Sequence, residues 1–389
     1  MTARYRDLFG VPEFRVLFSL QALSVTTDSI RMIALSVQAF ERTGSALLSA
    51  LVFGAGMLPY AVGGALLLSL ADRVPARRLL TGHHLLRFAA TAVLALGGLP
   101  PAATIALVAM VGLVAPVGSA AVQARLPALL PGDGHVLGRS LFTMTAAGAQ
   151  IAGQAVGGLL LSTLTTSGTL WLAAAGAALA ALIAPALPAA SIHARPASGT
   201  ARETWRVNRL LLGDRTTRGL LLAGWLPISL SVGAEGAVIP YADGHGDPGA
   251  AGLILAAGAA GMLAGNLAVG RLARPALRER LTLPLTLLTG APLLLFAWDP
   301  VLPLACALMA AGTFGLSYEL TVQRRLVDAA PEPVRGQALG LSGTGVMTGQ
   351  AAGIGAAGAL TDVAAPSLVI AFCGAAAVIA ALLLISHLR

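Results

Sequence analysis

Long apolar runs, separated by short polar breaks, follow one another along almost the whole of this 389-residue chain. A helix needs about 20 apolar residues to cross a bilayer, where its backbone must satisfy its own hydrogen bonds. The clearest breaks combine proline with glycine or aspartate, as at Pro131-Gly132 and Asp299-Pro300. The pattern predicts twelve membrane-spanning helices, at residues 14–40, 45–70, 79–98, 102–123, 140–162, 168–190, 219–241, 250–272, 281–297, 300–322, 337–360 and 366–386.

One long polar segment divides this pattern near its middle. Residues 191–218 carry six arginines and form a predicted cytoplasmic linker between an N-terminal bundle, 1–190, and a C-terminal bundle, 219–389. Within the linker, Thr200 to Leu212 is a candidate for a short amphipathic helix on the bilayer surface. The predicted fold class is therefore an all-α membrane protein with twelve transmembrane helices in two pseudo-symmetric six-helix bundles.

An internal repeat supports the division into halves. Residues 122–160 align with residues 322–360 in a register of 200 residues without a gap. The polar identities carry most weight because Ala, Leu and Gly recur by composition alone. These identities are Gln123/Gln323, Arg125/Arg325, Pro131/Pro331 and Gln150/Gln350. Two parallel repeats of six helices are an arrangement that secondary transporters use.

Composition and charge agree with a membrane protein. Hydrophobic residues make up 56% of the chain and charged residues 11%, and the mean hydropathy is +0.81. All 25 basic residues are arginine, and with the N-terminus inside nearly all of them fall on the cytoplasmic side. We therefore expect a bacterial inner (cytoplasmic) membrane location with both termini cytoplasmic. The net charge of +8 then reflects topology and contact with anionic lipid, and no nucleic acid partner is expected.

Two acids lie inside predicted spans. Asp28 is in the first helix and Glu235 in the seventh, which are corresponding helices of the two halves. A charge at that depth costs about 3 kcal/mol on insertion scales, so both are candidates for proton or substrate coupling. For Asp28 a purely structural reading stays open, because Arg31 lies one helical turn away and the two can neutralise each other. Glu235 has no basic neighbour in its own helix and lies between Gly233 and Gly236.

Other polar residues in the spans are candidates for the same cavity. Arg87 either snorkels to the interface or pairs with Asp28, Glu235 or an anionic substrate. Gln150 and Gln350 either line the cavity or form interhelical hydrogen bonds. Among the glycines, those at 153, 157 and 158 (Gly153, Gly157 and Gly158) have spacings that allow close helix packing.

Two short motifs resemble those of a known family. The predicted loop between the second and third helices reads Leu70-Ala71-Asp72-Arg73-Val74-Pro75-Ala76-Arg77-Arg78, and the fifth helix contains Gly153-Gln154-Ala155-Val156-Gly157-Gly158. The first resembles the loop motif of the major facilitator superfamily. The second resembles its antiporter motif, with Gln154 in place of proline. The stretch from Phe14 to Leu51 is similar to the twelve-helix drug and siderophore proton-antiporter branch of bacteria, and so is Arg335-Gly336-Gln337-Ala338-Leu339-Gly340-Leu341.

The resemblance implies a cytoplasmic gate. Asp72, Arg73, Arg77 and Arg78 would lock the gate by pairing with the other half, whereas the alternative is ordinary positive-inside loop charge. In the second half, Glu319 and Arg325 are the candidates for a matching lock, and Glu319 is alternatively a surface acid.

The sequence thus predicts a secondary active transporter for proton-coupled efflux of a small organic compound, in the manner of multidrug-resistance exporters. A proton-independent facilitator or importer is the first alternative, and a non-transporting receptor or scaffold is an alternative of another class. No nucleophile–base pair or metal cluster indicates an enzyme. We expect no cofactor or metal, a proton as the coupling ion, a small-molecule substrate, the lipid bilayer as surroundings, and a monomer. Few aromatics and scattered acids favour a neutral or cationic amphiphile.

Overall fold

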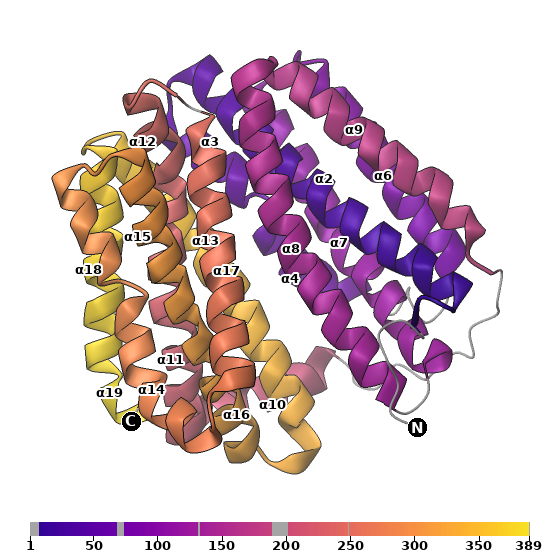
Figure 1. The fold of residues 1–389 in the computed structure, drawn as a ribbon. Helices are drawn as coiled ribbons and strands as arrows, with labels where there is room; N and C mark the ends of the chain where they lie inside the picture. Colours follow the sequence, from indigo (N-terminus) through magenta and orange to yellow (C-terminus); the bar gives the residue numbers. More distant parts are fainter. Residues whose placement is uncertain (1–7, 68–73, 131–132, 189–200, 248, 389) are drawn as a thin grey trace. The chain divides into compact units, whose positions relative to one another are not determined.

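The computed structural model describes residues 8–67, 74–130, 133–188, 201–247 and 249–388, and every regular element within them is helical (Figure 1). Its contacts separate into two compact units. Unit 1 contains Met1–Arg42 and Ala55–Pro196, and unit 2 contains Thr43–Gly54 and Ala197–Arg389.

Unit 1 is a bundle of long helices. They are α2 (Pro12–Thr43), α4 (Met57–Leu67), α6 (Ala76–Ala95), α7 (Pro101–Leu129), α8 (Asp133–Thr163) and α9 (Thr166–Ile183), followed by the short η1 (Ala184–Ala186). α6 packs against α9 and α7, and α4 packs against α7. The core at one end of the bundle is aromatic: Phe14 makes ring contacts with Phe9, Phe18 and Phe142 and is completely buried.

Unit 2 contains more interruptions. Its elements are α3 (Ala46–Gly54), α10 (Ala201–Gly213), α11 (Arg215–Gly233), η2 (Ala234–Ala237), α12 (Val238–Gly244), α13 (Ala250–Leu267), η3 (Ala268–Leu272), α14 (Pro275–Leu288), η4 (Pro292–Trp298), α15 (Leu302–Gly315), η5 (Leu316–Tyr318), α16 (Glu319–Ala329), η6 (Glu332–Val334), α17 (Arg335–Thr361), α18 (Pro366–Leu383) and α19 (Ile385–Leu388). The predicted spans 219–241, 281–297 and 300–322 thus each contain a 3₁₀ segment. At η4 the cause is local, because Pro292 has no backbone N–H to continue the helix.

The units differ from the predicted halves in one segment. Residues 43–54 belong to unit 2, although they lie within the predicted N-terminal bundle 1–190. The reason is close packing between small residues of α3 and α17. A Cβ at Gly358 would collide with Ala50 and Leu47, and Gly54 lies against Ala351 and Ile354. The predicted amphipathic segment coincides with α10, in which Trp205 is largely exposed.

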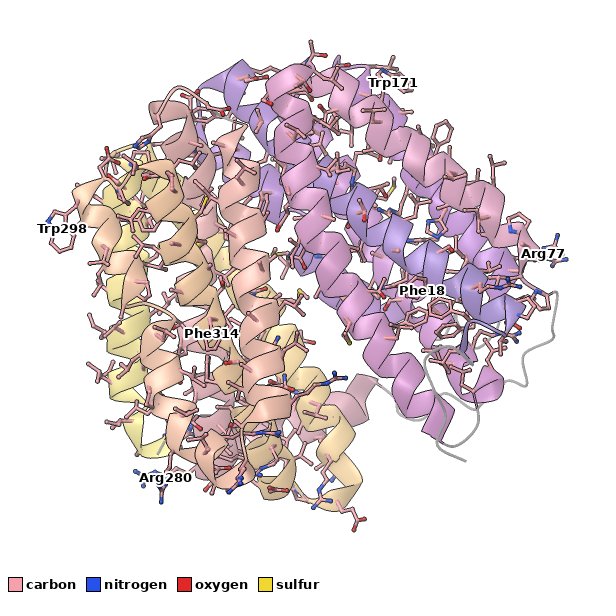
Figure 2. All side chains as sticks on the ribbon, in the orientation of Figure 1. Phe18, Arg77, Trp171, Arg280, Trp298 and Phe314 are labelled. Carbon is pink, nitrogen blue, oxygen red and sulfur yellow. The ribbon has the colours of Figure 1, made fainter. Side chains whose placement is uncertain are left out.

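Nine helical segments in the described part of the chain are long and apolar enough to cross a membrane. The helices α2, α6 and α17 are also long enough, with 32, 20 and 27 residues, but are not among these nine. α2 and α6 are the two that carry the buried charges described below. The predicted total of twelve spans therefore stays a prediction. Trp171 and Trp298 point away from the ribbon (Figure 2), as expected for side chains that face lipid or the membrane interface.

Glycines set the closest helix contacts in both units. In unit 1, Gly63 on α4 lies against the backbone of Leu113 on α7. In unit 2, the corresponding pair α13 and α15 meets through Gly261 and Gly265, which lie against the backbone of Ala310 and Phe314. A side chain at these positions would force the helices apart, so glycine permits the separation observed.

Candidate functional site

A cluster of charged side chains joins α2 to α6 within unit 1. Asp28 forms an ion pair with Arg31, one turn along the same helix, through its Oδ1 atom. The same oxygen lies 3.3 Å from Nη2 of Arg87 on α6. Arg87 also donates to the Ser24 hydroxyl and, at 2.9 Å, to the Ser24 carbonyl oxygen. The i+3 pair and the pairing of Arg87 with Asp28, both among the sequence alternatives, are thus present together.

Charge and burial are unequal in this cluster. The side chains of Arg31 and Arg87 are each 7% exposed, whereas that of Asp28 is 42% exposed. Two buried cations therefore share one accessible carboxylate. Arg31 uses only one nitrogen, because its Nε and Nη1 atoms are buried without a hydrogen-bond partner among the described residues. A buried donor that lacks a partner costs about 1–3 kcal/mol, and more for a charged group.

Two histidines extend the cluster along α6. His83 and His84 are buried, and their rings meet edge to face with centroids 5.2 Å apart. In the part of the chain that the structure describes, the Nδ1 atom of each is buried without a hydrogen-bond partner. The His83 ring lies in the space left by Gly118 on α7, where a Cβ would be 3.0 Å from Cδ2 of His83. Within the described residues, no group of three or more His, Cys, Asp or Glu side chains is placed to hold a metal ion.

Close contacts from α8 and α9 fix the position of α2. A Cβ at Gly153 would lie 2.6 Å from the Thr26 carbonyl oxygen and 2.7 Å from Cβ of Ser29. Gly157 lies against Ile30, and Gly176 on α9 lies against Thr27. Since these contacts flank Asp28 on both sides along the helix, they hold its backbone firmly against the rest of unit 1. Gly158, next to Gly157 on α8, is also buried.

The 200-residue repeat shows that unit 2 lacks this cluster. The positions corresponding to Asp28, Arg31 and Arg87 are Ile228, Ser231 and Leu287. Ser231 is buried and donates to the Thr289 carbonyl oxygen at 2.8 Å. In place of Gly118, unit 2 has Tyr318, which is completely buried and donates to the Ala223 carbonyl oxygen at 3.0 Å. The helix packing of the repeat therefore does not require charges at these positions.

Glu235 lies at a break in the seventh span. It belongs to the 3₁₀ segment η2, which interrupts the helix between α11 and α12. Gly233 and Gly236, on either side, approach the α17 backbone at Gly353 and Ile354. Within the described part of the chain, no hydrogen bond or ion pair to the Glu235 carboxylate is found. Broken helices of this kind mark ion and substrate sites in transporters.

The glutamine candidates have different environments. Gln150 and Gln350 are half-buried on α8 and α17. Gln154, one turn after Gln150, is 8% exposed, and its Oε1 atom is buried without a hydrogen-bond partner among the described residues. In the sequence, Gln154 stood out only as a departure from the proline of the antiporter motif. The departure itself was the signal for an additional polar group close to α2.

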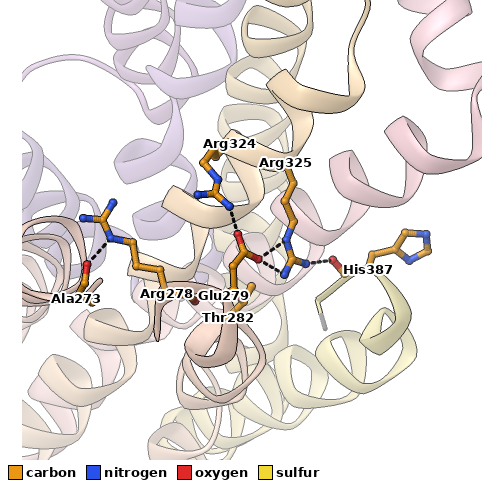
Figure 3. A network of polar contacts seen from close by, with 7 residues as sticks. All are labelled: Ala273, Arg278, Glu279, Thr282, Arg324, Arg325 and His387. Carbon is orange, nitrogen blue, oxygen red and sulfur yellow. Dashed lines mark hydrogen bonds and ion pairs between the residues drawn. The ribbon is translucent and has the colours of Figure 1, made fainter. Parts of the chain in front are cut away.

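The predicted gate residues are only partly placed. Asp72 and Arg73 lie outside the described residues. Arg77 and Arg78 are exposed in the first turn of α6, and Figure 2 labels Arg77. Arg325 pairs with Glu279 on α14, with Nε and Oε2 2.8 Å apart, and also donates to the His387 carbonyl oxygen at 2.9 Å (Figure 3).

The carboxylate that pairs with Arg325 is thus Glu279, which also binds Arg324. Glu319 instead accepts a hydrogen bond from Gln323 at 2.9 Å. Arg125, the repeat counterpart of Arg325, pairs with Glu13 at the start of α2. The two repeat arginines therefore both bind a carboxylate, but the carboxylates come from helices that do not correspond.

The two repeated helical units, their apolar spans and these charges within helices are those of a polytopic membrane protein of transporter architecture. A family model described as Major Facilitator Superfamily matches residues 17–318 and 228–389, and the chain belongs to this family.

Solved transporters of low sequence identity share the fold. A crystal structure of the nucleoside transporter NupG has a TM-score of 0.75 at 13% identity, with 97% of this chain and 99% of that chain covered. A POT family transporter in complex with 5-aminolevulinic acid has a TM-score of 0.75 at 11% identity, with 96% and 95% covered. The peptide transporter POT in complex with sulfate has a TM-score of 0.70 at 14% identity, with 99% and 98% covered. No curated protein matches the sequence.

Proposed function

We propose that this chain is a secondary active transporter that exports a small organic compound by alternating access, in exchange for protons. Membership of the family supports transport in general. The likeness of residues 14–51 and of residues 335–341 to drug and siderophore exporters supports the direction. The arginine distribution supports a bacterial inner membrane location with both termini cytoplasmic, and the protein acts as a monomer without a cofactor.

The observation that carries proton coupling is the position of Glu235. A carboxylate in a membrane span costs about 3 kcal/mol when charged, and binding a proton removes most of that cost. Glu235 lies at a helix break without an ion-pair partner among the described residues, so a proton is the simplest cation to neutralise it. Asp28 differs, because Arg31 and Arg87 already compensate its charge. We therefore assign proton binding to Glu235 and substrate contact to the Asp28 cluster.

The test uses purified protein reconstituted in liposomes. A thermal-shift screen at two pH values selects the transported compound, and its movement is then followed with and without a pH gradient. Glu235→Gln should abolish accumulation driven by the gradient while counterflow of labelled compound continues, because the neutral side chain no longer titrates. The control variant is Glu41→Gln, which changes an exposed acid near the C-terminal end of α2 and should behave as wild type.

Two results would contradict the proposal. Gradient-driven accumulation by Glu235→Gln at the wild-type rate removes Glu235 from the mechanism. If counterflow by the wild type shows no pH dependence, the mechanism is facilitated diffusion and not proton exchange. The presence of Gln154 where the antiporter motif has proline would agree with that result.

A further inference from the structure

The Asp28 cluster contains one more buried cation than it can neutralise. Arg31 and Arg87 are both buried, and among the described residues the only carboxylate that they contact is Asp28. The formal charge of the three side chains is therefore +1. Neither histidine of the cluster supplies negative charge. In a membrane span such an excess is expensive and is retained where it contacts a substrate or ion.

The unused hydrogen-bonding capacity belongs to the same residue. Arg31 is buried, and both its Nε and its Nη1 lack hydrogen-bond partners in the described part of the chain. A guanidinium presents five N–H groups in a planar fork that matches the two oxygens of a carboxylate or phosphate. Asp28 occupies a single nitrogen of this fork through Oδ1. A second anionic group would thus find both charge and donors unsatisfied.

Access to the cluster is through its acid. Asp28 is the exposed member, at 42%, while the arginines behind it are buried. An incoming anion reaches the guanidinium groups when the Asp28 side chain rotates away from one of them. Asp28 then acts as an internal competitor that occupies the site between substrates. Gly153 and Gly157 pack against α2 on either side of Asp28, so we expect the side chain to move and the backbone to stay in place.

The repeat argues against a purely structural role for these charges. Unit 2 has Ile228, Ser231 and Leu287 at the corresponding positions, and its buried Ser231 hydroxyl donates a hydrogen bond to the Thr289 carbonyl oxygen. If packing alone required the arginines, the second copy would be expected to contain an equivalent pair. Unit 1 instead has two buried cations at positions where unit 2 has none.

We propose that unit 1 binds an organic anion, whose carboxylate or phosphate group is held by Arg31 and Arg87 in place of Asp28. This assignment rests on the proposed transport function and deepens it, because it names the class of substrate. It also replaces the neutral or cationic amphiphile that composition favours.

The experiment measures thermal unfolding of the purified full-length protein in a neutral detergent. The probes are benzoate, phenyl phosphate and inorganic phosphate, with benzamide as the neutral counterpart of benzoate. Benzoate or phenyl phosphate should raise the midpoint, and benzamide should not. A separate sample receives phosphatidylglycerol, because a lipid headgroup offers the same phosphate chemistry. A rise with inorganic phosphate or lipid alone would assign the site to those sources and overturn the substrate assignment.

Three variants test the assignment: one should bind the anion more weakly, one more tightly, and one as the wild type does. Arg31→Gln should weaken benzoate or phenyl phosphate binding roughly tenfold or more, because one charged hydrogen-bond donor is lost. Asp28→Asn should lower the midpoint without ligand yet bind the anion roughly tenfold more tightly, since the competing carboxylate is gone. Arg15→Gln, at an exposed position on the same helix as Arg31, should match wild type.

The outcomes separate this inference from proton coupling. Equal shifts for wild type and Arg31→Gln, weaker binding by Asp28→Asn, or no shift with any organic anion would each overturn the inference. Should Arg31→Gln fail to fold, the gain in Asp28→Asn remains decisive. Glu235→Gln should bind the anions as wild type does. In the wild type, intact anion binding with no proton-driven transport would reject the proposed function alone, and proton-coupled transport without anion binding would reject this inference alone.

Discussion

Gly153→Ala should destabilise the protein, whereas Gly148→Ala, five residues earlier on α8, should not. The added Cβ at position 153 would lie 2.6 Å from the Thr26 carbonyl oxygen, 2.7 Å from Cβ of Ser29 and 3.1 Å from Cα of Thr26. Comfortable contacts between carbon atoms are about 3.5–4.0 Å, so α2 and α8 must separate by roughly 0.5–1 Å. At Gly148 nothing lies within 4 Å of the new atom.

The magnitude follows from two opposing effects. Overpacking of this kind costs about 1–3 kcal/mol, and it is at the upper end here because two of the three colliding atoms are backbone. Replacing glycine by alanine in a helix returns about 0.5–1 kcal/mol at either position. With the cost at about 2–3 kcal/mol, the net result is a loss of about 1–2.5 kcal/mol at 153 and a gain of about 0.5–1 kcal/mol at 148. The two variants should therefore differ by about 2–3 kcal/mol.

The assay is the unfolding midpoint of the two variants and the wild type in the same detergent. For a unit of this size, about 1 kcal/mol moves a thermal midpoint by roughly 2–4 °C, so the gap between variants should be several degrees. The repeat supplies a second matched pair. Gly353 lies against the backbone of Ser229 and Gly233, whereas a Cβ added at Gly343 would have nothing within 4 Å. If the two alanine variants unfold together in both pairs, close glycine packing is not what sets the helix separation.

Two further expectations concern unit 2. Tyr318→Phe keeps the buried ring but removes the hydroxyl that donates to the Ala223 carbonyl oxygen. The free energy of unfolding should therefore fall by about 0.5–1.5 kcal/mol in the same assay. An unchanged midpoint would show that this hydrogen bond contributes nothing. Asp214, at the start of α11, accepts a hydrogen bond from the backbone N–H of Thr217, and this bond holds the pKa of its carboxyl below the ordinary 3.8. Because the charged carboxylate is favoured in the folded state, it stabilises that state fully at neutral pH, and this contribution is lost as the pH falls below 3.8. Asp214→Asn should therefore make stability less dependent on pH in the acid range. Parallel acid curves for the variant and wild type would contradict this.

Local features of the site could be predicted from the sequence, and its distant contacts could not. Asp28 and Arg31 are one helical turn apart, so their pairing follows from helix geometry alone. The glycines beside Glu235 were also visible in the sequence, but their close approach to the α17 backbone at Gly353 and Ile354 was not. The partner of Arg325 is 46 residues away at Glu279, and Glu319, nearer in sequence, has a different partner. A choice among several acids at one end of a bundle depends on which helices are adjacent, and spacing along the chain does not contain that information.

Domain boundaries show the same limit. Hydropathy places residues 43–54 with the helices that precede and follow them, since it depends on sequence neighbours. Their assignment to unit 2 depends on α17, some 300 residues further along the chain, where Gly358 and Ala351 provide the complementary small surface. Small residues are frequent throughout this chain, so their presence in α3 and α17 did not single out this pair.

The repeat separates the residues that pack the helices from those that carry charge. Ser29 lies against Gly153 in unit 1, and Ser229 lies against Gly353 in unit 2, in the same 200-residue register. Between these matched contacts the charges diverge, since unit 1 has Asp28 and Arg31 where unit 2 has Ile228 and Ser231. Close packing is thus common to the two copies, and ionic chemistry is particular to each. Substitutions at the glycines should therefore act mainly on stability. Substitutions in the Asp28 cluster should act mainly on ligand binding, while the helix contacts persist.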